Sequence, residues 1–222
     1  YNWFQKPLLT GYPRGFNVFN GPFLNTKEKY VFKYCTEEKE TPVMTIHLPF
    51  AEGLHGGQVA KSMSDSKYYR GFALAAGFIF VEGKWCQEVP IDPRIYFSGE
   101  ESTMALRSFT HGWDLVHAPD VPIWHWYNTD NESLKRELHW EMHENDVELK
   151  QEKDRIIENA RKIVDEVLSG KEKGKYGIGT ERTLADYAHL SGIDYENKTY
   201  QRDKALFTEY ENCGLELDDD FE

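Results

Sequence analysis

Residues 74–128 constrain the fold more than any other part of the chain, because they concentrate polar side chains within an apolar and aromatic frame. A continuous apolar run flanked by glycines predicts a fully buried strand over 68–82. A proline-containing loop then leads to a helix expected over about 100–111, with Gly112 at its C-terminal end. A further strand is expected over 121–127.

Two adjacent carboxylates, Glu100 and Glu101, stand in the first turn of the expected helix, where the helix dipole favours negative charge. Adjacent residues at a helix start point in different directions, so one carboxylate can face a cleft while the other caps or pairs. One of them could accept hydrogen bonds from substrate hydroxyls or act as a base. The alternative is a stable helix start and nothing more. Ser98 and Gly99 precede the pair and permit close backbone approach, which favours the functional interpretation.

His125 lies on the expected strand at 121–127, with its tryptophan neighbours pointing to the opposite face. A histidine on an apolar strand is more often a core residue than a ligand. A neutral imidazole there could nevertheless complete a divalent-metal site if carboxylates arrive from elsewhere. His139 and His143 also share one helix face, but Glu141 does not give the HExxH pattern, so a solvated helix face is favoured over a zinc site.

Composition narrows the possible functions. A chain of 222 residues can bury a sizeable core and make one domain with an appendage. The formal net charge of -12 argues against nucleic acid as a partner, and no apolar run is long enough for a membrane span. Three cysteines far apart, without CxxC spacing, favour a reducing compartment, so we expect a cytoplasmic protein. The glycine-rich loop at 53–57 lacks the GxGxxG spacing of a nucleotide fingerprint.

The character of the sequence changes after residue 128. A charged helix is expected within 132–168, ended by Gly170, with one apolar face made of Ile156, Ala160, Ile163, Val164, Val167 and Leu168. Residues 183–186 resemble a capping box at the start of a short helix. Earlier in the chain, a strand is expected over 41–46. The acidic C-terminal tail is typical of a solvated terminus.

Several motifs then follow one another: AAGFIF, EVPIDP, FSGEE, THGWD and a strand of the form aliphatic-X-His. In this order they resemble the polypeptide GlcNAc-transferase family, whose best-known members act on hydroxyproline of a ubiquitin-ligase adaptor protein. The segment at 6–13 is similar to the family's KPxLTTYP pattern, and residues 179–187 look like its tail pattern. The resemblance covers nearly the whole chain.

This resemblance implies an α/β fold class, with a GT-A-like mixed sheet and flanking helices. Residues 1–130 would be the acceptor-side, C-terminal part of that catalytic domain, and 131–222 a helical extension. It also implies a cytoplasmic, retaining glycosyltransferase that uses a nucleotide-sugar donor, expected to be UDP-GlcNAc, and a protein acceptor. A divalent metal, usually Mn²⁺, is the implied cofactor.

The resemblance assigns roles to particular residues. The implied catalytic carboxylates are Glu100 and Glu101, the metal ligand is His125, and the substrate-binding residues are Ala76, Gly77, Trp113 and Asp114. The family's DxD-type or Asp-Ser-His metal motif lies upstream of the KPxLTTYP segment, so the remaining metal ligands and the nucleotide-binding half are expected upstream of this chain.

Two alternatives remain open. The same fold could act on a modified nucleobase or a glycan, since the loop at 53–57 departs from the family's usual segment. A non-catalytic scaffold that has lost the donor site would also lack the upstream aspartates. No dedicated protein nucleophile is evident, and the resemblance implies a front-face displacement in which the leaving phosphate helps to deprotonate the acceptor.

Overall fold

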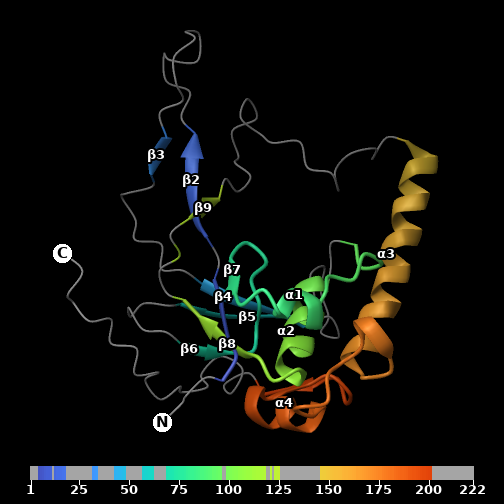
Figure 1. Cartoon of the computed structure of the whole chain (residues 1–222). Helices are drawn as coiled ribbons and strands as arrows, with labels where there is room; N and C mark the ends of the chain where they lie inside the picture. Colours follow the sequence, from blue (N-terminus) through green and yellow to red (C-terminus); the bar gives the residue numbers. More distant parts are fainter. Residues whose placement is uncertain are drawn as a thin grey trace, which may run out of the picture.

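A four-stranded mixed sheet forms the centre of the fold, with helices on one side of it (Figure 1). Its strands, in spatial order, are β6 (Tyr69–Gly71), β8 (Asp114–His117), β1 (Pro7–Thr10) and β7 (Ile79–Val81). Strand β1 runs parallel to β8, whereas β6 and β7 run antiparallel to their neighbours. This computed structural model describes residues 5–11, 13–18, 32–34, 43–48, 57–62, 69–96, 99–118, 121, 123–125 and 146–201. The mixed sheet with flanking helices confirms the predicted fold class.

The prediction of one buried strand over 68–82 is wrong. The chain leaves β6 at one side of the sheet and enters β7 at the other, so residues 72–78 cross β8 and β1 between them. Phe72, Ala73, Leu74 and Ala75 are buried as predicted, but they belong to neither strand. An apolar run reports that a segment is buried and does not fix its backbone conformation.

Two short strands of the central sheet, β1 and β8, escaped prediction because their sequences lack a clear period. Strand β1 carries the wholly buried Leu8, and β8 is buried at all four positions. The register pairs Leu8 with Leu115 and Thr10 with His117. The side chains of Thr10 and His117 therefore project from neighbouring positions on the same face of the sheet.

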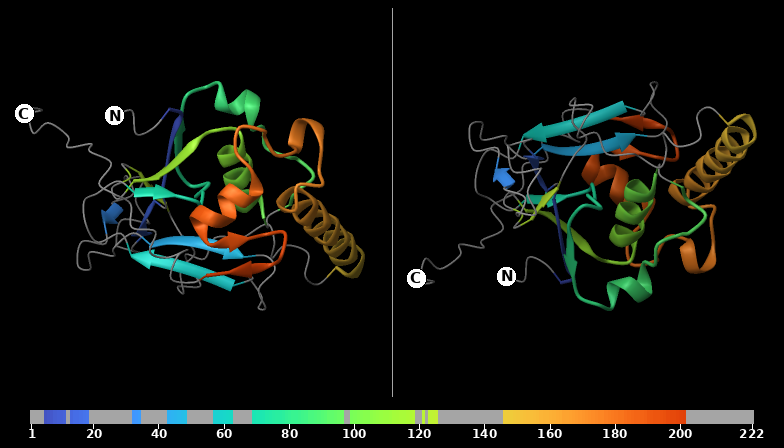
Figure 2. Two further views of the ribbon diagram at one scale, coloured as in Figure 1. Left: turned by 90° about the horizontal axis from the view of Figure 1, so that it is seen from below. Right: turned by 90° about the horizontal axis from the view of Figure 1, so that it is seen from above.

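Helix α2 (Glu100–Thr110) confirms the predicted helix, and α1 (Trp85–Glu88) precedes it. Gly99 is the N-cap with a left-handed φ of 95°, and Gly112, with φ of 84°, follows the C-cap. Helix α2 contacts β8, α3 and α4, so it lies between the sheet and the C-terminal helices (Figure 2).

The C-terminal region contains α3 (Val147–Leu168), the 3₁₀ helix η3 (Gly174–Tyr176), α4 (Leu184–Ser191), β10 (Ile193–Asp194) and β11 (Thr199–Tyr200). Helix α3 ends before Gly170 as predicted, while the stretch predicted to be helical at 132–145 lies outside the described residues. The α3 face is buried at Ala160, Val164, Val167 and Leu168, but Ile156 is 40% exposed and does not join it. Helix α4 begins with the predicted capping box between Thr183 and Asp186.

The remaining strands form two smaller sheets. Strands β3 (Phe32–Tyr34), β2 (Arg14–Val18) and β9 (Trp124–His125) form one, and the hairpin of β4 (Val43–Leu48) and β5 (Gly57–Ser62) forms the other. The strand predicted at 41–46 is β4, two residues later at each end. Of the strand predicted at 121–127, the structure describes β9, while positions 122, 126 and 127 lie outside the described residues.

The sheet and the C-terminal region share one hydrophobic core. Leu8 and Leu115 from the sheet belong to the same cluster as Val164, Tyr187 and Ile193. Within the described part of the chain, the helices are too short or too polar to cross a membrane.

Candidate active site

The turn at Ala75–Gly77 is held by side chains from two separate elements. The hydroxyl of Thr10 on β1 accepts a hydrogen bond from the Ala75 N–H (2.8 Å) and donates one to the Ala75 carbonyl (3.1 Å). The Ala76 N–H donates to Oε1 of Glu101 at the start of α2 (2.8 Å). The structure thus brings together two of the predicted site residues, Ala76 and Glu101, and fixes the turn between the sheet and a helix.

The two carboxylates at the start of α2 occupy different surroundings. Glu101 reaches the turn, while the adjacent Glu100 is half-buried, with its Oε2 atom shielded from solvent. Gly99 has a reason of its own to be glycine, because it adopts a left-handed conformation and a Cβ there would lie 2.5 Å from Val164 of α3. The contact with Val164 explains why residue 99 is a glycine without any ligand nearby, so Gly99 does not support the functional interpretation of the two carboxylates. Ser98 lies outside the described residues.

His125 is connected to the turn through β2. A Cβ on Gly77 would lie 2.7 Å from Cδ of Pro13, so the turn packs directly against the residue that precedes β2. Two residues further along, Gly15 pairs with His125 of β9. His125 therefore lies within roughly 15 Å of the turn. This distance combines one van der Waals contact, two residues of extended chain and one interstrand spacing.

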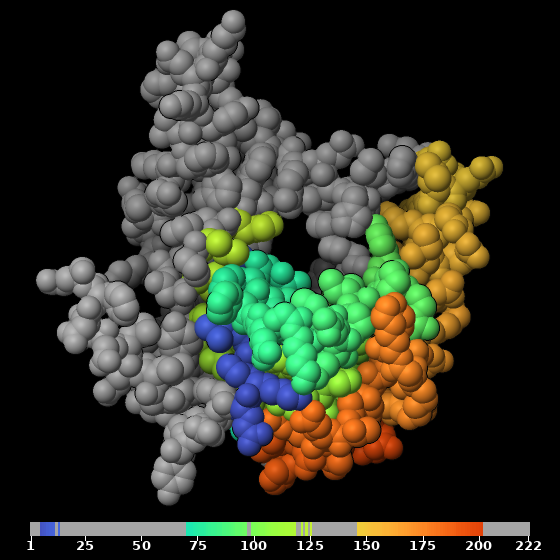
Figure 3. Space-filling view, viewed as in Figure 1, coloured from blue at the N-terminus to red at the C-terminus, as the bar shows by residue number. Residues whose placement is uncertain are grey.

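The space-filling view shows the arrangement of these segments. In Figure 3 the segment around β9 (yellow-green) lies beside the turquoise part of the 70–96 segment, and the green 99–118 segment follows on the other side of it. These three segments carry His125, the Ala75–Gly77 turn and Glu100 with Glu101, respectively. The elements that hold the predicted carboxylates and imidazole therefore approach one region of the surface.

Trp113 and Asp114 are placed differently, within the framework of the fold. Trp113 is 0% exposed, and its indole N–H donates to Oε2 of Glu88 (2.8 Å). Asp114 is 4% exposed, and its Oδ1 accepts hydrogen bonds from both Arg70 and Arg182 (2.8 Å each). In this structure both side chains hold other parts of the protein together.

The motif segments meet around Trp113. The Lys6 ammonium donates to the His111 carbonyl (2.9 Å) and to Glu181 (2.7 Å), and it lies 5.6 Å from the centre of the Trp113 ring. Arg182 donates to the Trp113 carbonyl (3.1 Å). Segments 6–13, 88–93, 110–114 and 179–187 thus form one polar network. Much of the motif pattern serves to join distant parts of the chain.

Comparison with known proteins identifies the family. A family model described as Glycosyltransferase (GlcNAc) matches residues 3–197 of the 222-residue chain. The chain belongs to this family. Neither the curated proteins nor the solved structures compared with this glycosyltransferase include a significant match. The resemblance found in the sequence is confirmed at the level of a glycosyltransferase.

The resemblance implies a divalent metal for this glycosyltransferase, and such an ion needs several ligands that lie close together. Among the described residues, no three His, Cys, Asp or Glu side chains are grouped closely enough to hold an ion. His125 is half-buried on β9, with its Nδ1 atom shielded from solvent. The described part of the glycosyltransferase therefore offers one candidate ligand and no complete metal centre.

Thr10 is a residue of the candidate site that was not predicted from the sequence. It stands within the motif segment 6–13, so the resemblance contained a signal. Nothing in the local pattern indicated that β1 would run beside the segment containing Ala75. A contact between residues 65 positions apart follows from sheet order, which a single sequence does not specify.

Proposed function

We propose that the protein transfers GlcNAc from UDP-GlcNAc to a hydroxyl group of a polypeptide, with retention at the anomeric carbon. The reaction class rests on the family match over residues 3–197. The choice of donor and acceptor rests on the motifs that resemble polypeptide GlcNAc-transferases. The single structural observation that carries the site is the hydrogen bond from the Ala76 N–H to Glu101.

The turn suits the approach of a sugar ring. Ala76 and Gly77 are exposed and carry only a methyl group and a hydrogen, so a ring can come close to their backbone. Thr10 holds the backbone of Ala75 and Glu101 accepts from the Ala76 N–H, so the turn is held from two sides. A rigid, sterically open turn is what a donor sugar needs if its anomeric carbon is to be held at one position.

Glu100 is the proposed partner of the sugar hydroxyls. A carboxylate accepts hydrogen bonds that are roughly twice as strong as those between neutral groups. Because Glu101 is engaged with Ala76, the adjacent Glu100 is the carboxylate we assign to the sugar. The acceptor hydroxyl would attack the anomeric carbon on the face from which the nucleoside diphosphate leaves. The bond to the diphosphate would break as the new glycosidic bond forms, with the hydroxyl proton passing to the leaving phosphate.

His125 is the proposed metal ligand of the described chain. A bound divalent ion would neutralise the charge that develops on the departing diphosphate. The role of His125 would be to hold that charge near the turn, to which β2 and Pro13 connect it.

The proposal is tested by transfer of radiolabelled GlcNAc by the full-length protein to separate pools of protein, DNA and glycan. Glu100→Gln and His125→Ala are each expected to reduce transfer to protein by about 100-fold or more, as when one charge-stabilising group is removed from an active site. Glu148→Gln is the matched control, because Glu148 also stands in the first turn of a helix and is exposed.

The control is expected to keep wild-type turnover. Wild-type turnover by both site variants would show that the site is wrong. Label that appears only in the DNA or glycan pool would show that the acceptor is not a polypeptide. No transfer to any pool would favour a non-catalytic scaffold.

A further inference from the structure

The segment Phe72–Ala76, here called the crossing segment, belongs to no strand, so its backbone N–H and C=O groups need hydrogen-bond partners other than those of a sheet. It passes over β8 and β1 on its way from β6 to β7. Its first four residues are at most 5% exposed. Buried N–H and C=O groups need hydrogen-bond partners. Side chains supply such partners at Phe72, Ala73, Ala75 and Ala76, and the Ala75 carbonyl also accepts from the Phe78 N–H (3.2 Å).

On the sheet side, the partners come from neighbouring strands in the order in which the segment crosses them. A ring nitrogen of His117 on β8 lies 2.9 Å from the Ala73 carbonyl, and Thr10 on β1 bonds both backbone groups of Ala75. His117 and Thr10 are partners in the register of the two strands. Gly71 leaves room for the His117 ring, which occupies the space that a Cβ there would take.

On the helix side, the partners come from α2 and α4. Glu101 accepts from the Ala76 N–H at one end of the crossing segment. At the other end, the hydroxyl of Tyr187 donates to the Phe72 carbonyl (2.8 Å). Tyr187 is 1% exposed, and its ring meets the rings of Phe72 and Phe109 edge-on.

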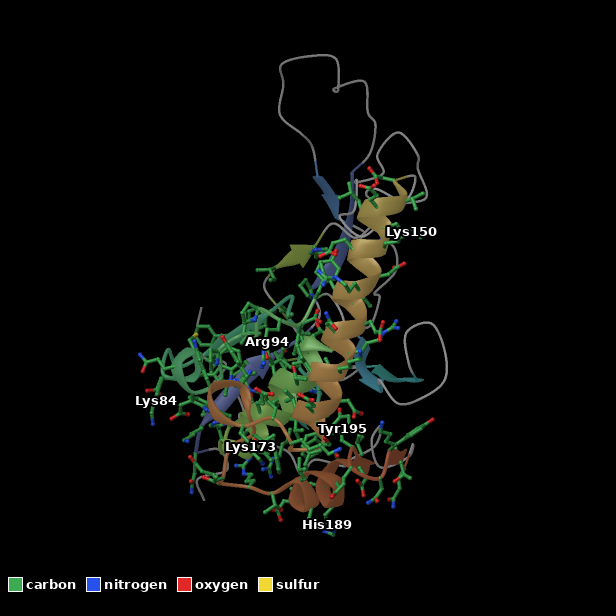
Figure 4. All side chains as sticks on the ribbon, turned by 90° about the vertical axis from the view of Figure 1, so that its right-hand side faces the viewer. Lys84, Arg94, Lys150, Lys173, His189 and Tyr195 are labelled. Atoms are coloured by element: carbon green, nitrogen blue, oxygen red, sulfur yellow. The ribbon has the colours of Figure 1, made fainter. Side chains whose placement is uncertain are left out.

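Tyr195 extends this contact to the helix that carries the carboxylates. Tyr195 lies in the interior near α4, whereas His189, a residue of α4, lies on the outside (Figure 4). Burial raises the pKa of Tyr195 to about 12. The Tyr195 hydroxyl is hydrogen-bonded to the side chains of Tyr187 and Ser102. Ser102 directly follows Glu101.

We propose that Tyr187 is a positioning residue for the donor sugar, acting through the crossing segment and not by contact with the substrate. The assignment rests on the proposed function, because it takes the turn that ends this segment to be the sugar-binding turn. Tyr187 fixes the beginning of the segment, and Tyr195 ties Tyr187 to α2 next to Glu101. Helix α4 thereby sets the distance between the turn and the carboxylates.

The test compares Tyr187→Phe with Thr183→Ala in the full-length protein. Tyr187→Phe removes the hydrogen bond to Phe72 and keeps the aromatic ring. Thr183→Ala removes the capping hydrogen bond from the Asp186 N–H (3.0 Å) and leaves the Tyr187 hydroxyl in place. The control therefore weakens the same helix without releasing the crossing segment.

Two readouts are measured at a temperature where all variants are folded. In Tyr187→Phe, amide hydrogen exchange in a peptide covering 72–78 is expected to become faster. The KM for UDP-GlcNAc is expected to rise about tenfold, as for a small displacement of a bound group, with the KM for the acceptor peptide unchanged. Thr183→Ala is expected to show neither effect.

The inference is overturned if Tyr187→Phe keeps wild-type exchange and donor KM, or if Thr183→Ala reproduces the donor-specific change. A wild-type protein that transfers no sugar would defeat the proposed function, while the exchange data would still decide whether Tyr187 holds the segment. If Tyr187→Phe does not fold, Tyr195→Phe breaks the link to Ser102 and must produce the same pattern for the inference to stand.

Discussion

Asp114 is a buried carboxylate whose partners reveal its role at the scale of a single residue. It accepts hydrogen bonds from Arg70 of β6 and Arg182, which lies just before α4, at 2.8 Å each. A charge with 4% exposure is tolerated only when it is paired in this way. Asp114 therefore joins the edge of the sheet to the C-terminal region.

Asp114→Asn is predicted to destabilise the fold by roughly 2–4 kcal/mol, somewhat less than for a fully buried pair because both arginines are partly exposed. The variant leaves two guanidinium groups facing a neutral amide. Urea denaturation gives the free energy of unfolding, and donor KM is measured in parallel. A role in the framework predicts lost stability with donor KM unchanged.

Asp165→Asn is the matched control, since Asp165 forms a solvent-exposed ion pair with Lys198 (2.8 Å). It is expected to cost less than about 1 kcal/mol. A large rise in donor KM for Asp114→Asn, with stability retained, would instead support the substrate-binding role that the motif resemblance implies.

At the scale of elements, the junction between α2 and α3 depends on a residue without a side chain. Gly99 begins α2 in a left-handed conformation, and Val164 of α3 occupies the space beside it. The start of α2 carries Glu100 and Glu101, so the closeness of the two helices also determines where the carboxylates stand.

Gly99→Ala is predicted to destabilise the protein by roughly 2–4 kcal/mol, the sum of a left-handed non-glycine residue and an overpacked contact. Thermal and urea denaturation measure the loss. Gly83→Ala serves as the control because nothing lies within 4 Å of its Cβ position. The control is expected to stay within about 0.5 kcal/mol of wild type. Equal effects of the two substitutions would contradict this account of the junction.

The elements that could be predicted from the sequence are those with local signals. The ends of α2 and α4 follow from capping residues and glycines within one or two turns of the helix. The strands at 7–10 and 114–117 could not be predicted, because their pairing joins residues about a hundred positions apart. The same limit explains the error at 68–82, where burial was foreseen and the crossing of the sheet was not.

The residues of the candidate site also divide into those predicted from local sequence and those that only the fold reveals. Local reasoning found Glu100 and Glu101 at a helix start, and the motif resemblance proposed Ala76 beside them. The contact between Glu101 and Ala76 needed the fold, as did the discovery of Thr10 and Tyr187 as partners of the same segment. Motif resemblance alone did not separate residues that face a ligand from residues, such as Trp113, that join distant segments.

At the scale of the whole molecule, the described chain has a core to which both ends contribute. Ile193 of β10 is 0% exposed and belongs to the same cluster as Leu8 of β1 and Leu115 of β8. Tyr187 and Tyr195 bring further aromatic surface from the C-terminal side. Burying side chains of this size stabilises a protein by about 1.5–3 kcal/mol each, a substantial share of the stability of an ordinary domain.

We therefore predict that the central sheet and the C-terminal region unfold in one transition. Ile193→Ala is expected to cost roughly 2–4 kcal/mol, as for other large-to-small changes in a core. Ile156→Ala, on the exposed part of α3, is the control and is expected to cost less than about 1 kcal/mol.

Far-UV circular dichroism and tryptophan fluorescence are followed in the same urea titration. Because Trp85 and Trp113 lie in the core away from β10 in sequence, both probes should shift to the same lower midpoint in Ile193→Ala. A fluorescence midpoint that stays at the wild-type value while the dichroism midpoint falls would show that the C-terminal region unfolds separately. In that case α4 could not hold the crossing segment throughout the stability range of the sheet.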